Sequence, residues 1–252
     1  MWRCGRLCKL VEVTTSADTP PLVGRAAALF EVALCSDIPT QLAVGATLAA
    51  VGIRPHTSTG ALSLRYVAWL SLADTGLLLG LIYLFIRTHN ERFRDVLLGT
   101  RRIAREIQLG LPLTIGALFL AIVMVAAIRI LVPSLHNLPR NPLEELIQRP
   151  RDAWTFAIVV VIAGGVREEI QRAFILHRFD VWLGGPIVGL IVSSIGFGLG
   201  HGLQGNDVTV ATGMLGLYWG VIYLRRRSCV APMVSHAGFN LIEVLQYFVV
   251  GR

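Results

Sequence analysis

Long runs of apolar residues, separated by short polar stretches, occupy most of this 252-residue chain. A membrane-spanning helix needs about 20 predominantly apolar residues, and several stretches come near that length. They lie at residues 26–53, 66–86, 112–133, 153–175, 186–203, 208–224 and 229–250. The pattern predicts an all-α protein, a polytopic transmembrane helical bundle with about seven spanning helices.

The composition supports this prediction. Hydrophobic residues make up 54% of the chain and charged residues 15%, and the mean hydropathy is +0.63. This apolar share exceeds that of ordinary soluble domains. The formal charge of +7 does not indicate a nucleic-acid partner, because the basic residues lie mostly in short clusters between apolar runs. The expected partner is the lipid bilayer.

Arginines concentrate in the loop at residues 88–110, and a second basic cluster covers residues 225–227. Because basic loops tend to remain on the cytoplasmic side, we expect both to be cytoplasmic, together with an N-terminal segment, residues 1–25. No short apolar core with a cleavage site follows the first basic residues, so the N-terminus should be retained. We expect one membrane domain, residues 1–252, that crosses the cell membrane several times, in a bacterial inner membrane.

Two adjacent acids, Glu168 and Glu169, stand near the end of the apolar run at residues 154–166. A carboxylate in hydrocarbon must be neutral, paired or facing a polar cavity, so it is a functional candidate. On a helix Glu168 shares a face with Arg172, whereas Glu169 points about 100° away. We therefore expect Arg172 to pair with Glu168. One glutamate of such a pair suits general-base work, while the alternative is a solvated helix end without a catalytic role.

Two later apolar runs each carry a histidine at helical spacing. One contains Phe197 and His201 with glycines around them, and the other contains His236 and Asn240 on one helical face. An imidazole and a carboxamide can both donate hydrogen bonds to a developing oxyanion. Taken singly, each pair is more often a packing feature. Together with an acid, however, they are the groups needed to hydrolyse an amide with an activated water.

The order Glu-Glu, then Phe-x-x-x-His, then His-x-x-x-Asn on successive late helices resembles the CPBP family of intramembrane glutamic endopeptidases. This family includes the CAAX prenyl proteases and bacteriocin-processing or self-immunity proteins. The stretch at residues 216–240 also looks like the family's last two helices. The resemblance covers residues 154–245, within a catalytic region that we expect at residues 153–250.

The resemblance implies an endopeptidase that cuts a peptide or protein substrate near the membrane surface, with CAAX-type processing as one activity of the family. It implies water activation by Glu168 together with His201, and an oxyanion hole formed by His236 and Asn240. Glu169 and Arg172 would support these groups. The chemistry implied uses no metal and no cofactor.

One departure from the family's pattern concerns the arginine. The family places three residues between its glutamate pair and the arginine, whereas only Ile170 and Gln171 stand there in this chain. This leaves open which glutamate is the base. A second tension is depth: at about 1.5 Å per residue, Glu168 lies roughly 10 Å from the cytoplasmic boundary and His201 about 20 Å from it. Contact between them would require a tilted helix or an earlier helix start.

Other functions remain open. Glu168, His201 and His236 are also a set of the kind that binds zinc with one open position, although the chain lacks a His-Glu-x-x-His signature. A non-catalytic membrane protein, for bacteriocin self-immunity or partner binding, would keep the helices without the chemistry, and the displaced arginine favours it. A proton-coupled transporter would use intramembrane acids such as Asp37 and Asp74.

Acids in the first two apolar runs are expected to have structural or interfacial roles. Glu31 should lie near an interface with Arg25, and Asp37 directly precedes Ile38 and a proline, which predicts a helix interruption. Glu243 lies beyond the later histidine motif on nearly the same helical face, so it is a further candidate that could be overlooked.

The remaining polar residues are expected to have no role in chemistry. Histidines in or beside loops should be solvated, namely His56, His89, His136 and His177. Serines near the motifs have no obvious paired base, namely Ser193, Ser194 and Ser235. The cysteines have neither zinc-site nor disulfide spacing, namely Cys4, Cys8, Cys35 and Cys229.

Overall fold

The computed structural model of the chain describes residues 22–139 and 141–250. Within these residues the chain is helical and has no strand, apart from an isolated β-bridge between His56 and Leu62. The predicted all-α class is confirmed. The expected N-terminal cytoplasmic segment lies almost wholly outside the described residues.

The helices follow the apolar runs along the chain. The α-helices are α1 (Leu22–Leu34), α2 (Ile38–Ala50), α3 (Leu64–Thr88), α4 (Ile103–Leu131), α5 (Pro150–Val159), α6 (Glu168–Trp182), α7 (Pro186–Gly200), α8 (Asn206–Arg226) and α9 (Val230–Val250). Two π-helical segments are η2 (Arg94–Leu98) and η5 (Val160–Arg167). The 3-10 turns are η3 (Pro133–Leu135), η4 (Pro142–Leu146) and η6 (Gly202–Gln204).

Fewer helices than predicted have the length and composition to cross a membrane. Within the described residues they are α3, the stretch Arg94–Leu131 that contains α4, and α8, and the bent pair of α1 and α2 adds a fourth if it forms one span. The helix α7 has 15 residues, fewer than the roughly 20 required. The chain has the helices of a membrane protein, but seven crossings are not confirmed.

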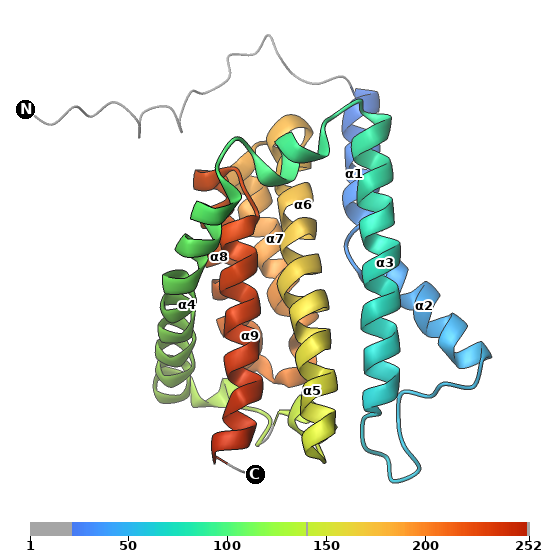
Figure 1. Ribbon diagram of the computed structural model, residues 1–252, viewed down its shortest axis with the longest axis vertical. Helices are drawn as coiled ribbons and strands as arrows, with labels where there is room; N and C mark the ends of the chain where they lie inside the picture. The colour runs from blue at the N-terminus through green and yellow to red at the C-terminus, as the bar shows by residue number, and fades with distance from the viewer. Residues whose placement is uncertain (1–21, 140, 251–252) are drawn as a thin grey trace, which may run out of the picture.

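The helices form two groups (Figure 1). The helices α4 to α9 pack as a bundle, while α1, α2 and α3 stand along one side of it, where α1 contacts α6 and α3 contacts α5 and η5. The three elements α5, η5 and α6 follow one another without a break and form a central rod, the part of the bundle that faces α1 and α3.

Glycines allow close helix contacts within the bundle. A Cβ atom added to Gly165 in η5 would lie 2.6 Å from the Cβ atom of Ala237 in α9, and one added to Gly198 in α7 would lie 2.7 Å from the carbonyl oxygen of Thr209 in α8. Real Cβ atoms do not approach so closely. Small residues at these positions therefore let helix backbones pack directly against one another.

The first helical pair is interrupted at Asp37, as predicted. The helix α1 ends at Leu34, α2 begins at Ile38, and the two are bent by 42°. Asp37 between them has a φ of 71°, a backbone conformation that is uncommon for residues other than glycine. The bend turns the Asp37 side chain toward the central rod, where it contacts Arg167.

Candidate active site

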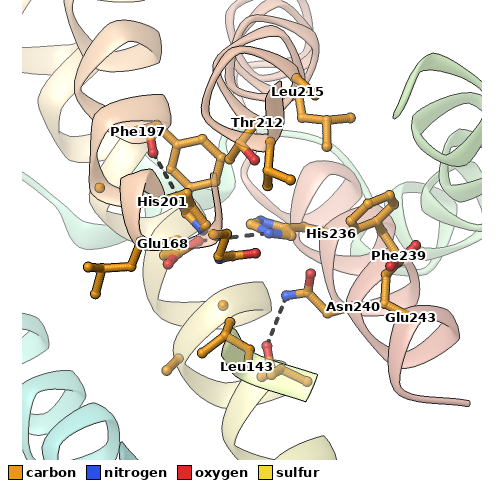
Figure 2. Close-up of a pocket in the computed structure, with 18 of the residues that line it drawn as sticks. Leu143, Glu168, Phe197, His201, Thr212, Leu215, His236, Phe239, Asn240 and Glu243 are labelled. Atoms are coloured by element: carbon orange, nitrogen blue, oxygen red, sulfur yellow. Dashed lines mark hydrogen bonds and ion pairs between the residues drawn. The ribbon is translucent and has the colours of Figure 1, made fainter. Parts of the chain in front are cut away.

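A cavity of about 2370 Å³, partly open to the outside, is lined by residues of α1, α2 and α3 from one group and of α4 to α9 with η4, η5 and η6 from the other. Glu168, His201, His236 and Asn240 all line it and gather in one part of it (Figure 2). The structure thus brings together the residues for which the sequence suggested a shared site. Glu169 lies behind them and is only 1% exposed.

The hairpin of α6 and α7 brings Glu168 and His201 to the same level of the bundle. Glu168 is the first residue of α6, which has 15 residues, and His201 directly follows α7, which also has 15. The turn between them contains Gly184 and Gly185, with φ of 97° and 95°. The predicted helix end near residue 175 is wrong, because α6 continues to Trp182. With the longer α6, Glu168 and His201 lie about equally far from the turn, and the predicted difference in depth disappears.

His201 is held at the end of α7 by the residue one turn before it. Its Nδ1 atom lies 2.8 Å from the carbonyl oxygen of Phe197, and the two rings lie 4.8 Å apart between centroids. A carbonyl oxygen only accepts, so Nδ1 carries the hydrogen, and in the neutral ring Nε2 is left as an acceptor. The Phe-x-x-x-His spacing therefore orients a free imidazole nitrogen toward the cavity (Figure 2).

Glu169 and Arg172 form a buried ion pair that also holds His236. Arg172 donates from Nη1 to the Oε1 atom of Glu169, and His236 Nδ1 lies 2.8 Å from the same oxygen. The Arg172 guanidinium also lies over the ring of Phe197, 4.4 Å from its centroid. The expected pairing of Arg172 with Glu168 is therefore wrong. The aromatic ring of α7 and the buried acid draw the arginine inward, and an i,i+3 contact to Glu169 results.

Trp219 of α8 fixes the ring plane of His236. The two rings stack with centroids 3.8 Å apart and an angle of 15° between their planes, and the indole nitrogen of Trp219 donates to Ser235 Oγ at 3.1 Å. Trp219 is a site residue that the sequence reasoning missed. It stood within the stretch that resembled the family, but an aromatic residue in an apolar helix gives no signal of its own.

Glu168 has one engaged oxygen and one without a hydrogen bond. Its Oε1 atom accepts from Arg167 Nη2 at 3.2 Å. Its Oε2 atom is buried without a hydrogen-bond partner and lies 3.8 Å from His236 Nε2. Buried polar atoms almost always have a partner, and a polar separation of this length suits a bridging water. Glu168 can therefore hold a water or a substrate group in the cavity.

Asn240 faces the cavity one helical turn after His236. Its Nδ2 atom donates to the carbonyl oxygen of Val160 at 3.2 Å, at the start of the π-helical segment η5. Gly164 provides the room for this carboxamide, since a Cβ atom there would collide with Nδ2. An amide nitrogen has two hydrogens, so one remains to donate to a ligand.

Residues 150–242 match the family model "Type II CAAX prenyl endopeptidase Rce1-like". The resemblance to the CPBP family is confirmed over this part of the chain, and the match implies a protease, a hydrolase of peptide bonds. No curated protein and no solved structure matches the chain. The Rce1-like region, residues 150–242, contains Glu168, Glu169, Arg172, His201, His236 and Asn240, whereas the further candidate Glu243 lies just beyond it.

Within the described part of the chain no group of three or more His, Cys, Asp or Glu residues is placed to hold a metal ion. The Nδ1 atom of His236 bonds Glu169, and that of His201 bonds a backbone carbonyl. Metal-bound histidines make the same bonds, so it is the missing ligand cluster, and not the orientation of the two rings, that disfavours a zinc site here.

Among the histidines expected to be solvated, His136 is exposed as predicted, whereas His89 and His177 are partly buried, so the prediction is wrong for these two. All three hydrogen-bond a carboxylate. The bonded pairs are His89 with Glu31, His136 with Asp207, and His177 with Glu91. His56 is exposed, as expected.

The structure also locates the other residues that the sequence singled out. Glu31 is structural, as expected, but its partners are Arg178 and His89 rather than Arg25. Glu243 is exposed and lines the cavity of the Rce1-like region. Two cysteines are buried and free, namely Cys35 and Cys229, while Cys4 and Cys8 lie outside the described residues.

Proposed function

We propose that the chain is an intramembrane endopeptidase that hydrolyses a peptide bond by direct attack of water. The observation that carries this proposal is the free Oε2 atom of Glu168, buried in the cavity that also receives His201, His236 and Asn240. A base with an open acceptor and donors beside it are the requirements of such a hydrolysis. We further propose a bacterial inner membrane with the basic loops on the cytoplasmic side.

The reaction follows from the hydrogen-bond pattern. A water bound at Glu168 Oε2, with Nε2 of His201 as a second acceptor, gives a proton to the carboxylate while its oxygen attacks the carbonyl carbon. The oxyanion accepts hydrogen bonds from the remaining Asn240 N–H and from His236. The imidazolium form of His236 suits this role, because Nδ1–H has Glu169 as acceptor and Nε2–H points toward the cavity.

The collapse of the tetrahedral intermediate returns the proton. The carbon–nitrogen bond breaks, and the proton held by Glu168 passes to the leaving amine, directly or through His201. Glu169 stays ionised beside Arg172 and keeps His236 in orientation, so the two glutamates have different tasks. The separation arises from burial, since Glu168 has access to the cavity and Glu169 does not.

The substrate class is inferred from the matched family and from the residues that line the cavity. The family model names CAAX prenyl endopeptidases, and apolar residues such as Ile122, Leu199 and Phe239 line much of the cavity. A C-terminal CAAX peptide, with and without a prenyl group, is therefore the first substrate to test. The non-catalytic alternative loses its support, because Arg172 reaches the glutamate pair despite its shifted position.

The test is cleavage of quenched-fluorescence CAAX peptides by the purified protein in detergent. Glu168→Gln and His201→Ala should abolish cleavage without lowering the melting temperature. Asp95→Asn and His56→Ala make the same chemical changes at exposed positions and should leave the rate unchanged. If wild-type protein cuts none of the peptides, or if Glu168→Gln cuts as fast as wild type, the proposal fails.

A further inference from the structure

A second buried arginine, Arg167, contacts the proposed base directly. It is the last residue of η5 and is 6% exposed. Its Nη2 atom donates to Glu168 Oε1 at 3.2 Å, and its Nε atom donates to the carbonyl oxygen of Ala163 at 3.2 Å. Arg167 therefore bonds Oε1 of Glu168, while Oε2 of the same side chain remains without a hydrogen bond.

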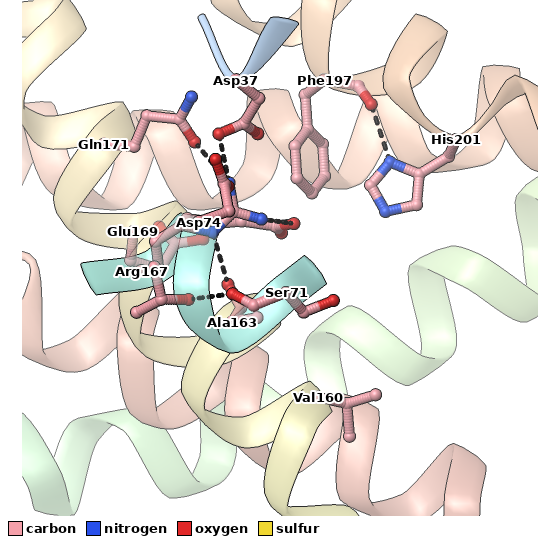
Figure 3. Close-up of polar contacts among 12 residues, drawn as sticks. Asp37, Ser71, Asp74, Val160, Ala163, Arg167, Glu169, Gln171, Phe197 and His201 are labelled. Atoms are coloured by element: carbon pink, nitrogen blue, oxygen red, sulfur yellow. Dashed lines mark hydrogen bonds and ion pairs between the residues drawn. The ribbon is translucent and has the colours of Figure 1, made fainter. Parts of the chain in front are cut away.

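Arg167 is held from outside the Rce1-like region by two aspartates of the first helices (Figure 3). It donates from Nη1 to the Oδ1 atom of Asp37, and the same nitrogen lies 3.8 Å from Oδ2 of Asp74 in α3. Asp74 is 1% exposed. Nη1 thus faces both aspartates while Nη2 bonds Glu168, and a planar guanidinium with several donors can bridge acids on two sides in this way.

The conformation of Asp37 indicates that this contact is built into the fold. Asp37 stands at the N-cap position of α2, where an aspartate usually accepts a hydrogen bond from the helix backbone, yet its side chain makes no such bond. Its φ of 71° is a strained conformation, and such strain persists only where the surroundings hold it. Here the carboxylate bonds Arg167 instead of capping the helix.

A second contact fixes the same bend. Gln171 Nε2 donates to the carbonyl oxygen of Cys35 at 2.7 Å, and Gln171 Oε1 lies 3.4 Å from Arg167 Nη1. Gln171 is one turn after Arg167 on the central rod. The bend between α1 and α2 is therefore attached both to the helix that carries Glu168 and to the arginine that contacts it.

We propose that Arg167, held by Asp37 and Asp74, is a positioning residue for Glu168, so that α1, α2 and α3 complete an active site that the Rce1-like region alone leaves unfinished. The proposal rests on the proposed function for the role of Glu168. Arg167 keeps Oε1 of the glutamate occupied and its charge compensated, and it leaves Oε2 to the water. Arg172 cannot serve in its place, because it is bonded to Glu169.

The first measurement separates the rate constant from substrate binding. Arg167→Gln and Asp37→Asn should each lower kcat, by roughly 100-fold for Arg167→Gln, as expected for a misplaced catalytic group, with KM nearly unchanged. Arg167→Lys should lower kcat less than Arg167→Gln, because lysine keeps the positive charge but lacks the paired donor nitrogens of the guanidinium. Arg178→Gln, at a fully buried arginine outside the cavity, should lower the melting temperature but leave the kcat of the folded protein near wild type.

The second measurement does not depend on cleavage. A hydrophobic carbodiimide reacts with protonated carboxyl groups, and removal of a neighbouring guanidinium favours the protonated form. Labelling of Glu168, located by fragment-ion mass spectrometry, should be several-fold faster in Arg167→Gln than in wild type or Arg178→Gln. If Arg167→Gln does not fold, Asp37→Asn carries the test through kcat and Arg167→Lys through both measurements.

The outcomes distinguish the two proposals. If no peptide is cut but Glu168 labelling is faster in Arg167→Gln, the proposed function fails and the positioning of Glu168 stands. If peptides are cut but both kcat and labelling are the same in Arg167→Gln as in wild type, the positioning proposal is overturned and the proposed function stands.

Discussion

Two buried arginines on the same central rod have very different surroundings. Arg178 is fully buried and donates to Glu31 Oε2 at 2.5 Å and to Glu91 Oε2 at 2.7 Å. The other oxygens of these acids bond His89 and His177, each at 2.6 Å. Every carboxylate oxygen in this closed cluster has a partner. Such an arrangement holds helices together and leaves nothing for a ligand.

The cluster around Arg167 is open. Asp37 and one oxygen of Glu168 are bonded to the arginine, but Oε2 of Glu168 and both oxygens of Asp74 are buried without hydrogen bonds. Like the closed cluster, this open cluster consists of a buried arginine with acids around it. The difference teaches that incomplete pairing next to a cavity, rather than the mere presence of buried charge, distinguishes a functional site from a structural one.

The largest effect should come from the open cluster. Glu168→Gln removes the base but keeps the size of the side chain, so cleavage should fall by roughly 10² to 10⁴-fold, while the melting temperature stays within a few degrees of wild type. Peptide cleavage and thermal unfolding in detergent measure the two quantities. A large loss of stability in this variant would contradict the distinction between the clusters.

The closed cluster should respond in the opposite way. Arg178→Gln leaves Glu31 and Glu91 without their shared partner, and breaking a buried ion pair costs about 3–5 kcal/mol of stability. Denaturant or thermal unfolding should show this loss. Glu31→Gln, which removes one acid of the same cluster, should also destabilise the fold, and neither variant should change the kcat of molecules that remain folded.

A moderate effect is expected from the aromatic wall of the site. Trp219→Leu removes the ring that stacks on His236 but keeps an apolar side chain. Aromatic contacts of this kind contribute about 0.5–1.5 kcal/mol, so kcat should fall by up to about tenfold. Steady-state kinetics at saturating peptide measure it. A normal kcat would show that the ring plane of His236 does not depend on Trp219.

The smallest effect concerns pH and the loop acid Glu91. Burial acts to raise its pKa, but hydrogen bonds from His177 and Arg178 outweigh burial and lower the pKa below the ordinary value. A lowered pKa in the folded state means that the ionised acid stabilises the fold above the unfolded pKa, about 4.3, and that this contribution disappears as the pH falls through the folded value.

The comparison of wild type with Glu91→Gln tests this pH dependence. The difference in melting temperature should be constant near neutral pH and should shrink below a pH of about 4. A difference that grows on acidification would reverse the sign and contradict the lowered pKa.

The helical class and the meeting of the motif residues could be predicted from the sequence, because apolar periodicity and fixed spacing are local properties. Asp37 was recognised as a helix break for the same reason. Its contact with Arg167 could not be predicted, since the two are 130 residues apart and a single sequence does not show which buried charges meet.

The errors near Glu168 have one cause. The charged stretch from Arg167 to Arg172 resembles a solvated helix end, so the helix was expected to stop near residue 175 and Arg172 to take its nearest acid by spacing. The structure instead buries this stretch, pairs Arg167 with Asp37, and bonds Glu169 both to Arg172 and to His236 of α9. Local spacing cannot distinguish a charge that faces water from one that faces a distant helix.

The equal arms of the α6–α7 hairpin have a consequence for the evolution of the chain. Glu168 and His201 lie at nearly equal numbers of residues from the same turn. The distance between them therefore does not depend on bilayer thickness or on the depth of the hairpin in the membrane. A residue inserted into one arm would rotate one of the two groups by about 100°, and one inserted into each arm would rotate both. Matched insertions of about two turns, roughly seven residues on each side of Gly184, would preserve their meeting. Homologous proteins should therefore lengthen or shorten these two helices together.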